Sequence, residues 1–283
     1  MKKLNLLIIL LVVGLVVWFY QARQPEVFSL TFFDVGQGDA ALVQIPGGQN
    51  ILIDGGPDRS VLSKLGQTLP WGNRQIDLVI LSHPHSDHVT GLAAVLENYQ
   101  VRQVLITGVS HTAPAYLQFL QYIRDKKIPA LIGESGQIIK LAGGVEVQVL
   151  YPTSSYAAKV VADINTTSLV VKIKYGETGV LFTGDMPIEV ENELLRRQLD
   201  LSAQILKIGH QGSLTSSGLD FLQAVNPTYA VISVGARNLY GHPSAEVLNR
   251  LQNRGIIYWR TDQAGDIKFV SDGKIWEALN HRP

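Results

Sequence analysis

The chain has 283 residues, 46% of them hydrophobic, and its 24 lysines and arginines balance 24 aspartates and glutamates. This hydrophobic content is ample for a buried core, and the zero net charge excludes a protein that holds nucleic acid through a global basic field. A polyanionic substrate would have to be held locally, by metal and a few cations. Because the sequence has no cysteine, disulfides and thiolate ligands are excluded as well, and a metal site would consist of histidines and carboxylates.

The first segment of the chain is apolar. Two lysines precede residues 4–20, which carry no charge and end in three aromatic residues. A stretch of this length reaches the lower limit for a helix that spans a bilayer of about 30 Å, and the lysines predict a cytoplasmic N-terminus. We therefore expect residues 1–26 to be a single-pass membrane anchor with a short polar connection, and residues 27–283 to lie outside the cytoplasmic membrane. The alternative is a cleaved signal peptide and a secreted domain, although no small-residue cleavage site follows.

Short strand patterns alternate with helical patterns through the remaining chain. Runs ended by Gly, Pro or Asp predict strands over residues 28–33, 41–45, 51–53, 78–81, 103–106, 145–150, 168–174, 179–182, 203–208, 229–233 and 256–259. Apolar residues at three- and four-residue spacings predict helices over residues 60–69, 88–98, 115–126, 188–199, 216–224 and 245–252. The alternation predicts an α/β protein in which helices cover mixed sheets. The length favours two packed sheets in a single domain, residues 27–283.

A run of metal-ligand side chains follows one predicted strand: His83, Pro84, His85, Ser86, Asp87 and His88. Neutral imidazoles bind borderline divalent metals, and the carboxylate can serve as a ligand or as a base that orients water. His83 and His85 share one face of a tight turn, whereas Asp87 and His88 begin the next helix and face differently. This pattern predicts two metals side by side. The alternative is a surface loop with incidental histidines, against which the density of ligand-type groups argues.

Two later strands also end in ligand-type residues. One ends in Gly184 and Asp185, and the other ends in Gly209 and His210. After the first strand, Gly184 allows a tight turn that places the Asp185 carboxylate over the edge of the sheet. After the second strand, Gly209 precedes His210 in the same way. Asp185 could instead be a helix N-cap, and His210 could be a hydrogen-bonding loop residue. Taken with the first motif, both are predicted to be metal ligands.

These segments resemble the metallo-β-lactamase superfamily, whose hallmark is His-x-His-x-Asp-His. Residues 33–40, 183–185, 207–213 and 240–243 resemble, within that superfamily, the extracytoplasmic hydrolase domain of ComEC-type competence proteins. The resemblance implies a four-layer αββα sandwich with the active site at one edge of two packed sheets. ComEC-type proteins carry many transmembrane helices and this chain has one candidate, so the chain is not expected to be the pore, and a DNA-uptake channel would be a separate partner.

The resemblance also implies the ligand set. It assigns two divalent metals, Zn²⁺ or Mn²⁺, to six ligands: His83 and His85 for the first, Asp87, His88 and His210 for the second, and Asp185 as the bridge. Asp54 would organise the site through hydrogen bonds rather than touch a metal.

The sequence departs from the family in two places. No histidine stands between His111 and His210, where many members supply a third ligand to the first metal. Asn165 and Ser168 offer only weak oxygen ligands or hydrogen bonds there, so the first metal is expected to be held weakly. His111 could approach the site or be a solvated loop residue. Gln211 stands where a second histidine commonly follows the first.

The predicted activity is metal-dependent hydrolysis by a metal-bound hydroxide, with DNA or another phosphodiester as substrate. Asp87 is a predicted catalytic residue, and His242 is the candidate acid for the leaving group, unless it is a turn residue before Pro243. The residues predicted to contact substrate are Lys207, Arg237, Asn238, Asn165 and Ser168. Alternative functions are hydrolysis of esters, lactones or thioesters on the same metals, or a binding module that has lost catalysis. The oligomeric state stays open.

Overall fold

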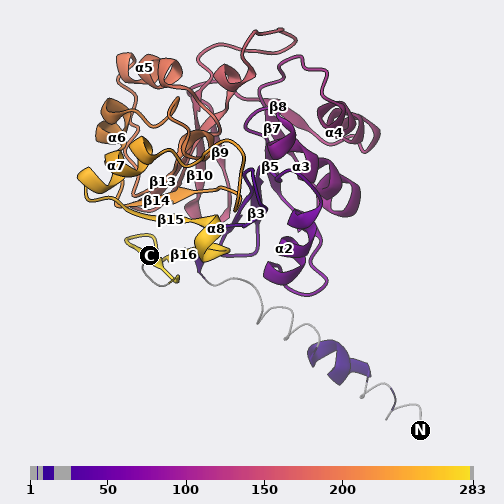
Figure 1. Cartoon of the computed structure of the whole chain (residues 1–283). Helices are drawn as coiled ribbons and strands as arrows, with labels where there is room; N and C mark the ends of the chain where they lie inside the picture. The colour runs from indigo at the N-terminus through magenta and orange to yellow at the C-terminus, as the bar shows by residue number, and fades with distance from the viewer. Residues whose placement is uncertain (1–4, 6–8, 16–26, 281–283) are drawn as a thin grey trace.

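The computed structural model describes residues 5, 9–15 and 27–280 (Figure 1). Most of the predicted membrane anchor, residues 1–26, therefore lies outside the described residues. Its described residues, 5 and 9–15, are helical, and the large apolar side chains of residues 9–15 are between 51% and 64% exposed. Among the residues that the structure describes, no helix is both long enough and apolar enough to cross a membrane.

Residues 27–280 form a sandwich of two mixed sheets. In this described range, the first sheet has eight strands in the order β17(Trp276–Ala278), β16(Ile267–Ser271), β1(Phe28–Phe32), β2(Ala41–Gln44), β3(Asn50–Ile53), β5(Leu78–Ile80), β7(Val104–Ile106) and β8(Ala130–Ile132). The second has seven, in the order β15(Ile257–Arg260), β14(Tyr229–Ile232), β13(Ile205–Lys207), β12(Thr178–Phe182), β11(Val170–Tyr175), β10(Glu146–Tyr151) and β9(Ile138–Lys140). A small pair, β4(Gln75–Ile76) and β6(Gln100–Val101), forms a separate two-stranded sheet, and β4 contacts β3 of the first sheet.

Each sheet is antiparallel at one end and parallel at the other. Strands β17 to β3 pair antiparallel, and β3, β5, β7 and β8 pair parallel. In the second sheet, β9 to β12 pair antiparallel and β12 to β15 pair parallel. The predicted mixed sheets are thus confirmed.

Helices cover both outer faces, which gives four layers (Figure 1). The first sheet is covered by α2(Ser60–Thr68), α3(Ser86–Asn98) and α4(Pro114–Asp125), and the second by α5(Ile188–Arg196), α6(Leu219–Val225) and α7(Ala245–Asn253). Short helical turns are η1(Ala142–Gly144), η2(Ile164–Thr167), η3(Gly209–Gly212) and α8(Thr261–Ala264). Helix α3 illustrates why these segments are helical: Val89, Leu92 and Leu96 recur at helical spacing and are buried against the sheet.

The core between the sheets draws on both of them. Phe32 and Ile80 of the first sheet pack in one buried cluster with Val147 and Val171 of the second. The prediction omitted β4, β6, β8, β9, β16 and β17. Alternate residues of β16 are buried, which is the pattern of a half-buried strand. The strands that precede the ligand-type residues, β3, β5, β12 and β13, all end at the same edge of the sandwich.

Candidate metal centre

The turn between β5 and α3 carries the His-x-His-x-Asp-His run. His83 lies just beyond β5 and is 1% exposed, and His85 has extended backbone angles immediately before α3. Asp87 and the fully buried His88 belong to the first turn of that helix. Gly38 lets the helix start pack closely, because a Cβ there would meet the backbone oxygen of Asp87 at 2.2 Å. The segment that contains Gly36 and Gly38 therefore packs directly against the first turn of α3.

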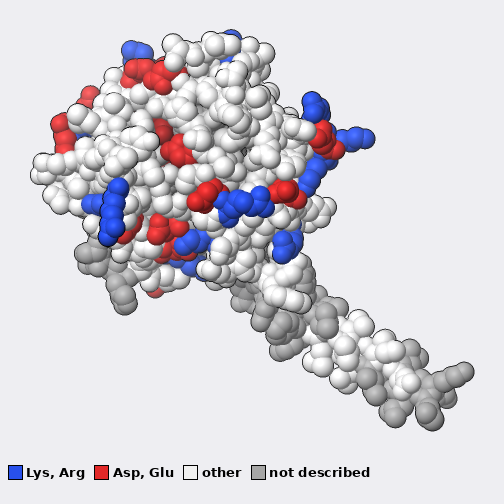
Figure 2. Space-filling model, turned by 45° about the vertical axis from the view of Figure 1, so that its right-hand side comes forward, with Lys and Arg blue, Asp and Glu red and all other residues white. Residues whose placement is uncertain are grey.

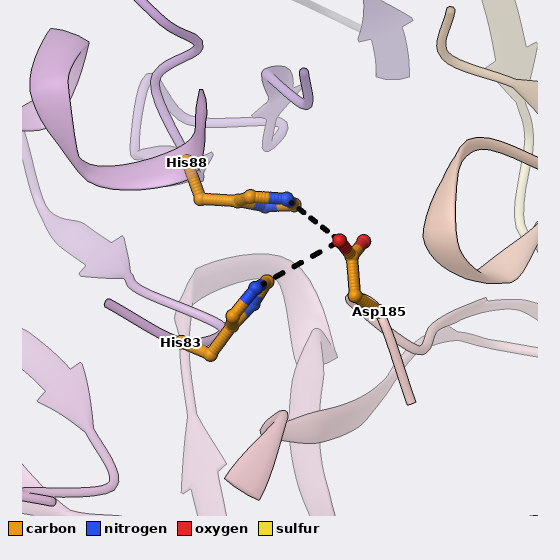
Figure 3. Close-up of side chains that lie close together, drawn as sticks. All are labelled: His83, His88 and Asp185. Atoms are coloured by element: carbon orange, nitrogen blue, oxygen red, sulfur yellow. Dashed lines mark ion pairs between the residues drawn. The ribbon is translucent and has the colours of Figure 1, made fainter. Parts of the chain in front are cut away.

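Asp185 is the point at which histidines from different strand ends meet. Its Oδ2 lies 3.8 Å from Nε2 of His83, 3.4 Å from Nε2 of His88 and 3.7 Å from Nε2 of His210. Figure 3 shows the first two rings converging on this carboxylate. Gly184, with a φ of +52°, makes the turn that the sequence predicts at the end of β12. Atoms that share a tetrahedral ion at about 2.0–2.2 Å lie roughly 3.3–3.6 Å apart, so this spacing is close to that of metal ligands.

His85 and Asp87 extend the cluster toward solvent. Nδ1 of His85 lies 3.0 Å from Nε2 of His83, and Oδ2 of Asp87 lies 3.6 Å from Nε2 of His88. The side chains of Asp87 and His210 are 28% and 27% exposed, whereas those of His83 and His88 are fully buried. The structure therefore brings all six predicted ligands together and leaves one side of the cluster open.

The donor set fits divalent metal ions. Nε2 of His88 and Oδ1 of Asp185 are buried and have no hydrogen-bond partner in the described part of the chain. Leaving such an atom unpaired costs on the order of 1–3 kcal/mol, a cost that a bound cation removes. The alternative role of Asp185 as a helix cap does not occur, since Pro187 precedes α5 and no side chain caps that helix.

Asp54 orients one of the histidines. Its Oδ2 is 2.8 Å from Nδ1 of His88, and its two oxygens accept from the hydroxyl and the backbone N–H of Ser82. An ionised carboxylate accepts only, so the proton of His88 is assigned to Nδ1, which leaves Nε2 facing Asp185. A carboxylate behind a histidine ligand in this way fixes its tautomer and its ring orientation.

The charges of the buried groups suit a metal. Burial lowers the pKa of His83 well below its ordinary value, and the neighbouring His88 adds to this, so His83 is neutral at neutral pH. Burial would also lower the pKa of His88, but Asp185, Asp87 and other carboxylates outweigh it and raise that pKa well above the ordinary value. Without metal, His88 therefore carries a positive charge among carboxylates. A divalent cation would take over that charge and release the proton.

Lys207 lies beneath the cluster rather than beside a substrate. Its side chain is 3% exposed, and its ammonium contacts Oδ2 of Asp39 and lies 3.5 Å from the backbone oxygen of Gly184. Burial raises the pKa of Asp39 to about 6 in spite of the attraction of Lys207. Burial would lower the pKa of Lys207, but Asp39 and Asp185 raise it. The predicted contact of Lys207 with a phosphate does not fit this enclosed position, and we correct it to an internal counter-charge.

Gln211 contacts one of the predicted ligands. The side chain is 3% exposed, and its Nε2 donates to Oδ2 of Asp87 at 2.8 Å. Its Oε1 accepts from Nε2 of Gln37, whose Oε1 accepts from the backbone N–H of Gly235 at 2.9 Å. Sequence reasoning treated Gln211 as a loss and missed Gln37 altogether. The only signal for Gln37 was its place between two glycines in the segment over residues 33–40.

Asn165 and Ser168 occupy different positions. Ser168 is fully buried and its hydroxyl accepts from the backbone N–H of Asp185 at 3.2 Å, so it positions Asp185 and cannot contact substrate as predicted. Asn165 lines a pocket of about 480 Å³ together with His210 and Thr215, and its Oδ1 is buried without a partner. Asn165 therefore remains a candidate contact for a ligand beside His210.

The loop over residues 235–242 borders the cluster. The ring centroid of His242 is 5.5 Å from that of His210 and 5.8 Å from that of Tyr240, on which it stacks. Asn238 uses both ends of its side-chain amide on the loop backbone, including bonds to the N–H and the oxygen of His242. Its amide is thus occupied within the loop, which does not fit the predicted substrate contact. Arg237 is exposed.

The pKa of His242 bears on its predicted role. Burial lowers it, and His210 adds to the effect. The ring is therefore neutral at neutral pH, which favours a hydrogen-bonding role over the predicted role as an acid.

His111 lies at the other side of the cluster. Its ring centroid is 6.4 Å from that of His85, and its Nδ1 accepts from the backbone N–H of Ala113 at 3.2 Å. It lines a largely apolar pocket of about 490 Å³ with residues such as Tyr116 and Val160. Of the two alternatives for His111, approach to the site describes its position better than a solvated loop.

Comparison with known sequences identifies the family. The sequence pattern of the metallo-beta-lactamase superfamily matches residues 33–236, which include the six clustered residues. The chain belongs to the metallo-beta-lactamase superfamily. Members of this superfamily are metal-dependent hydrolases, and the cluster around Asp185 supplies candidate ligands for its divalent ions.

Among curated proteins, the chain is similar to ComE operon protein 3 of Bacillus subtilis, with 31% identity over 87% of this chain and 33% of the relative. It is 30% identical to competence protein ComA of Neisseria gonorrhoeae, over 92% of this chain and 35% of the relative. It is 28% identical to recombination protein 2 of Haemophilus influenzae, over 92% of this chain and 31% of the relative. The chain thus spans about a third of the length of these relatives.

Solved structures share the fold at low identity. The protein YhfI from Bacillus subtilis has a TM-score of 0.53 and 15% identity, over 86% of this chain and all of YhfI. The metallo hydrolase Igni18 from Ignicoccus hospitalis has a TM-score of 0.55 and 16% identity, over 85% of this chain and 98% of Igni18. These likenesses concern the fold alone.

Proposed function

We propose that the chain is a metal-dependent nuclease, tethered at the outer face of the cytoplasmic membrane, that hydrolyses phosphodiester bonds in DNA. The observation that carries the proposal is the cluster of six candidate metal ligands at an open edge of the sandwich, in which three histidines lie within 3.8 Å of the Asp185 carboxylate. The names of two relatives refer to competence and recombination, which favours DNA among the substrates of this superfamily. A separate DNA-uptake channel would then be its partner.

Two divalent ions would be held as the resemblance implies, by His83 and His85 on one side, by Asp87, His88 and His210 on the other, and by Asp185 between them. When bound, they supply Lewis-acid polarisation of the phosphate and activation of water. The chain's own groups prepare this site: Asp54 fixes the His88 tautomer, and Gln211 holds Asp87. Zn²⁺, Mn²⁺ and Fe²⁺ all suit imidazole and carboxylate ligands.

The surface beside the cluster supports a locally held DNA strand. Figure 2 shows Lys, Arg, Asp and Glu interspersed over the visible face, without a continuous basic patch. Tyr240, 72% exposed, presents an aromatic ring next to His242, and Arg237 is an exposed cation on the same loop. Base stacking on an exposed ring suits single strands because every base has a π-face. DNA would thus be held by the metals, Tyr240 and Arg237.

Membrane tethering rests on the sequence. Residues 4–20 carry no charge, and the described residues 9–15 are helical with exposed apolar side chains. With the N-terminal lysines inside, a single-pass anchor would place residues 27–283 on the outer side of the cytoplasmic membrane. The alternative is secretion after signal cleavage.

The test is a substrate panel on the purified full chain with added Mn²⁺ or Zn²⁺, using single- and double-stranded DNA, a phosphodiester reporter and acyl ester, lactone and thioester reporters. We expect DNA cleavage that Asp87→Asn abolishes. Turnover confined to acyl substrates would overturn the nuclease proposal. No turnover of any substrate would instead favour a binding module.

A second function has one observation in its favour. The pocket beside His111 is lined mainly by apolar side chains, among them Leu117, Leu120 and Val160. Such a pocket next to the metal cluster suits the hydrocarbon part of an ester, a lactone or a thioester. The acyl reporters in the panel test this alternative directly.

A further inference from the structure

The strands of the sandwich begin and end at two opposite edges, and the metal cluster occupies only one of them. The described domain begins at the opposite edge, where Val27 leads into β1 (Figure 1). Phe28 pairs with Ser271, so the turn over residues 272–275 lies beside the chain entry. The neighbouring strands continue this edge: Ser29 pairs with Gln44, and Gln44 pairs with Asn50.

The loop between α2 and β4 belongs to the same edge. The side chain of Asn50 donates to the backbone oxygen of Gln75 at 3.3 Å, and Asp77 accepts from the backbone N–H of Asn50 at 2.9 Å. These bonds fix the end of the loop over residues 69–74 beside the start of β3. The chain entry, the 272–275 turn and this loop therefore lie along one side of the first sheet.

This edge carries exposed apolar side chains next to cations. Trp71 is 88% exposed, and Arg74 follows three residues later with its guanidinium 5.7 Å from the ring centroid of Tyr99. Ile275 is 68% exposed beside the exposed Lys274. A tryptophan this exposed is unusual in a soluble domain. Tryptophan is enriched where proteins meet the headgroup layer of a bilayer, and neighbouring Lys or Arg side chains are attracted to anionic lipids there. Among nearby acidic groups, Asp272 accepts from the backbone N–H groups of Lys274 and Ile275.

The length of the connection limits what can cover this edge. Only residues 21–26 separate the apolar segment from Val27, and a chain extends at most about 3.3–3.6 Å per residue. If residues 4–20 insert as proposed, the edge lies within about 20 Å of the bilayer surface. We infer that this edge docks on the phospholipid surface, with Trp71 and Ile275 in the headgroup layer. The metal cluster then faces away from the membrane, across the length of the strands.

This inference rests on the membrane tether of the proposed function. The absence of native cysteine makes a sharp test simple, since single cysteines can be introduced without removing others. The full chain would carry Trp71→Cys or Ile275→Cys, each labelled with an environment-sensitive fluorophore. The matched control is Leu239→Cys, because Leu239 is 98% exposed on the loop that borders the metal cluster. Each protein is reconstituted into phosphatidylethanolamine–phosphatidylglycerol vesicles that contain a lipid-attached quencher.

We expect the labels at positions 71 and 275 to be quenched at least threefold more strongly than the label at 239. Equal quenching at all three positions, on chains that float with the vesicles, would overturn the docking inference and leave the tether intact. Chains that do not float would overturn both. Energy transfer between labels on separate chains, without lipid quenching, would assign the edge to a second copy instead. DNA cleavage is measured on the same samples, so failure of the nuclease proposal is seen separately.

Discussion

The side-chain amide of Gln211 donates a 2.8 Å hydrogen bond to Oδ2 of Asp87, and through Gln37 the same amide is connected to the backbone of Gly235. Asp87 lies on α3 and Gly235 follows β14, so the contact joins the two halves of the sandwich across the metal cluster. Gln211 stands where many family members have a histidine. Its amide positions the carboxylate of Asp87.

Gln211→Ala should weaken metal binding at the second site by about 10- to 100-fold, the usual effect of removing a group that orients a metal ligand. Titration of the metal-free protein, followed by calorimetry, measures this. Gln198→Ala is the matched control, because Gln198 is exposed and also has a positive φ, 54° against 53° for Gln211. Unchanged affinity in Gln211→Ala would show that Asp87 is oriented without the amide.

Asp54→Asn should reverse the tautomer of His88. The carboxylate accepts from Nδ1, whereas an amide nitrogen would donate to it and move the ring proton to Nε2, the atom that faces Asp185. Nitrogen NMR of the metal-free protein reports the tautomer at a pH above the raised pKa of His88, where the ring is neutral. Metal affinity should fall about 10- to 100-fold. Asp58→Asn on the surface serves as the control. A His88 that keeps its proton on Nδ1 would contradict the assignment.

Tyr240→Ala should raise the KM for single-stranded DNA about tenfold or more while kcat changes little, since stacking contributes about 1–3 kcal/mol per base. Tyr240→Phe keeps the ring and should behave like the native chain. Steady-state kinetics on a short single-stranded oligonucleotide measure both. Equal KM values in the alanine and phenylalanine variants would remove Tyr240 from the substrate site.

Glu191 gives the chain a pH dependence of stability. Its carboxylate is 1% exposed and accepts from the backbone N–H groups of Ser217 and Gly218, and burial raises its pKa to about 7. The folded chain holds this proton more tightly than the unfolded chain. The stabilisation of the folded chain by protonated Glu191 is therefore fully present below pH 4.5 and is lost as the pH rises through about 7.

The free energy of unfolding should therefore fall by on the order of 2 kcal/mol between pH 5 and pH 8 through this residue. Glu191→Gln cannot ionise and should lose that part of the slope. Urea unfolding of both proteins across this range provides the comparison. Identical slopes would mean that Glu191 is ionised in the folded chain at pH 5.

The sequence allowed the ligand positions to be predicted because each follows a recognisable apolar strand, as His83 follows β5 and Asp185 follows β12. The mixed sheets followed from the alternation of strand and helix patterns. Contacts between side chains of distant segments could not be predicted from local sequence patterns. The burial of Lys207 against Asp39 and the link from Gln37 to Gln211 depend on how the two sheets pack, which local patterns do not encode.

The central claim is that residues meeting at Asp185 hold two divalent ions. The most direct measurement is the metal content of the purified chain after loading with Mn²⁺ or Zn²⁺, by mass spectrometry. We expect two equivalents in the native chain after loading, fewer in His210→Ala, and none retained in Asp185→Asn, with circular dichroism confirming that each variant is folded. Fewer than one equivalent in the native chain, or two equivalents in folded Asp185→Asn, would contradict the account.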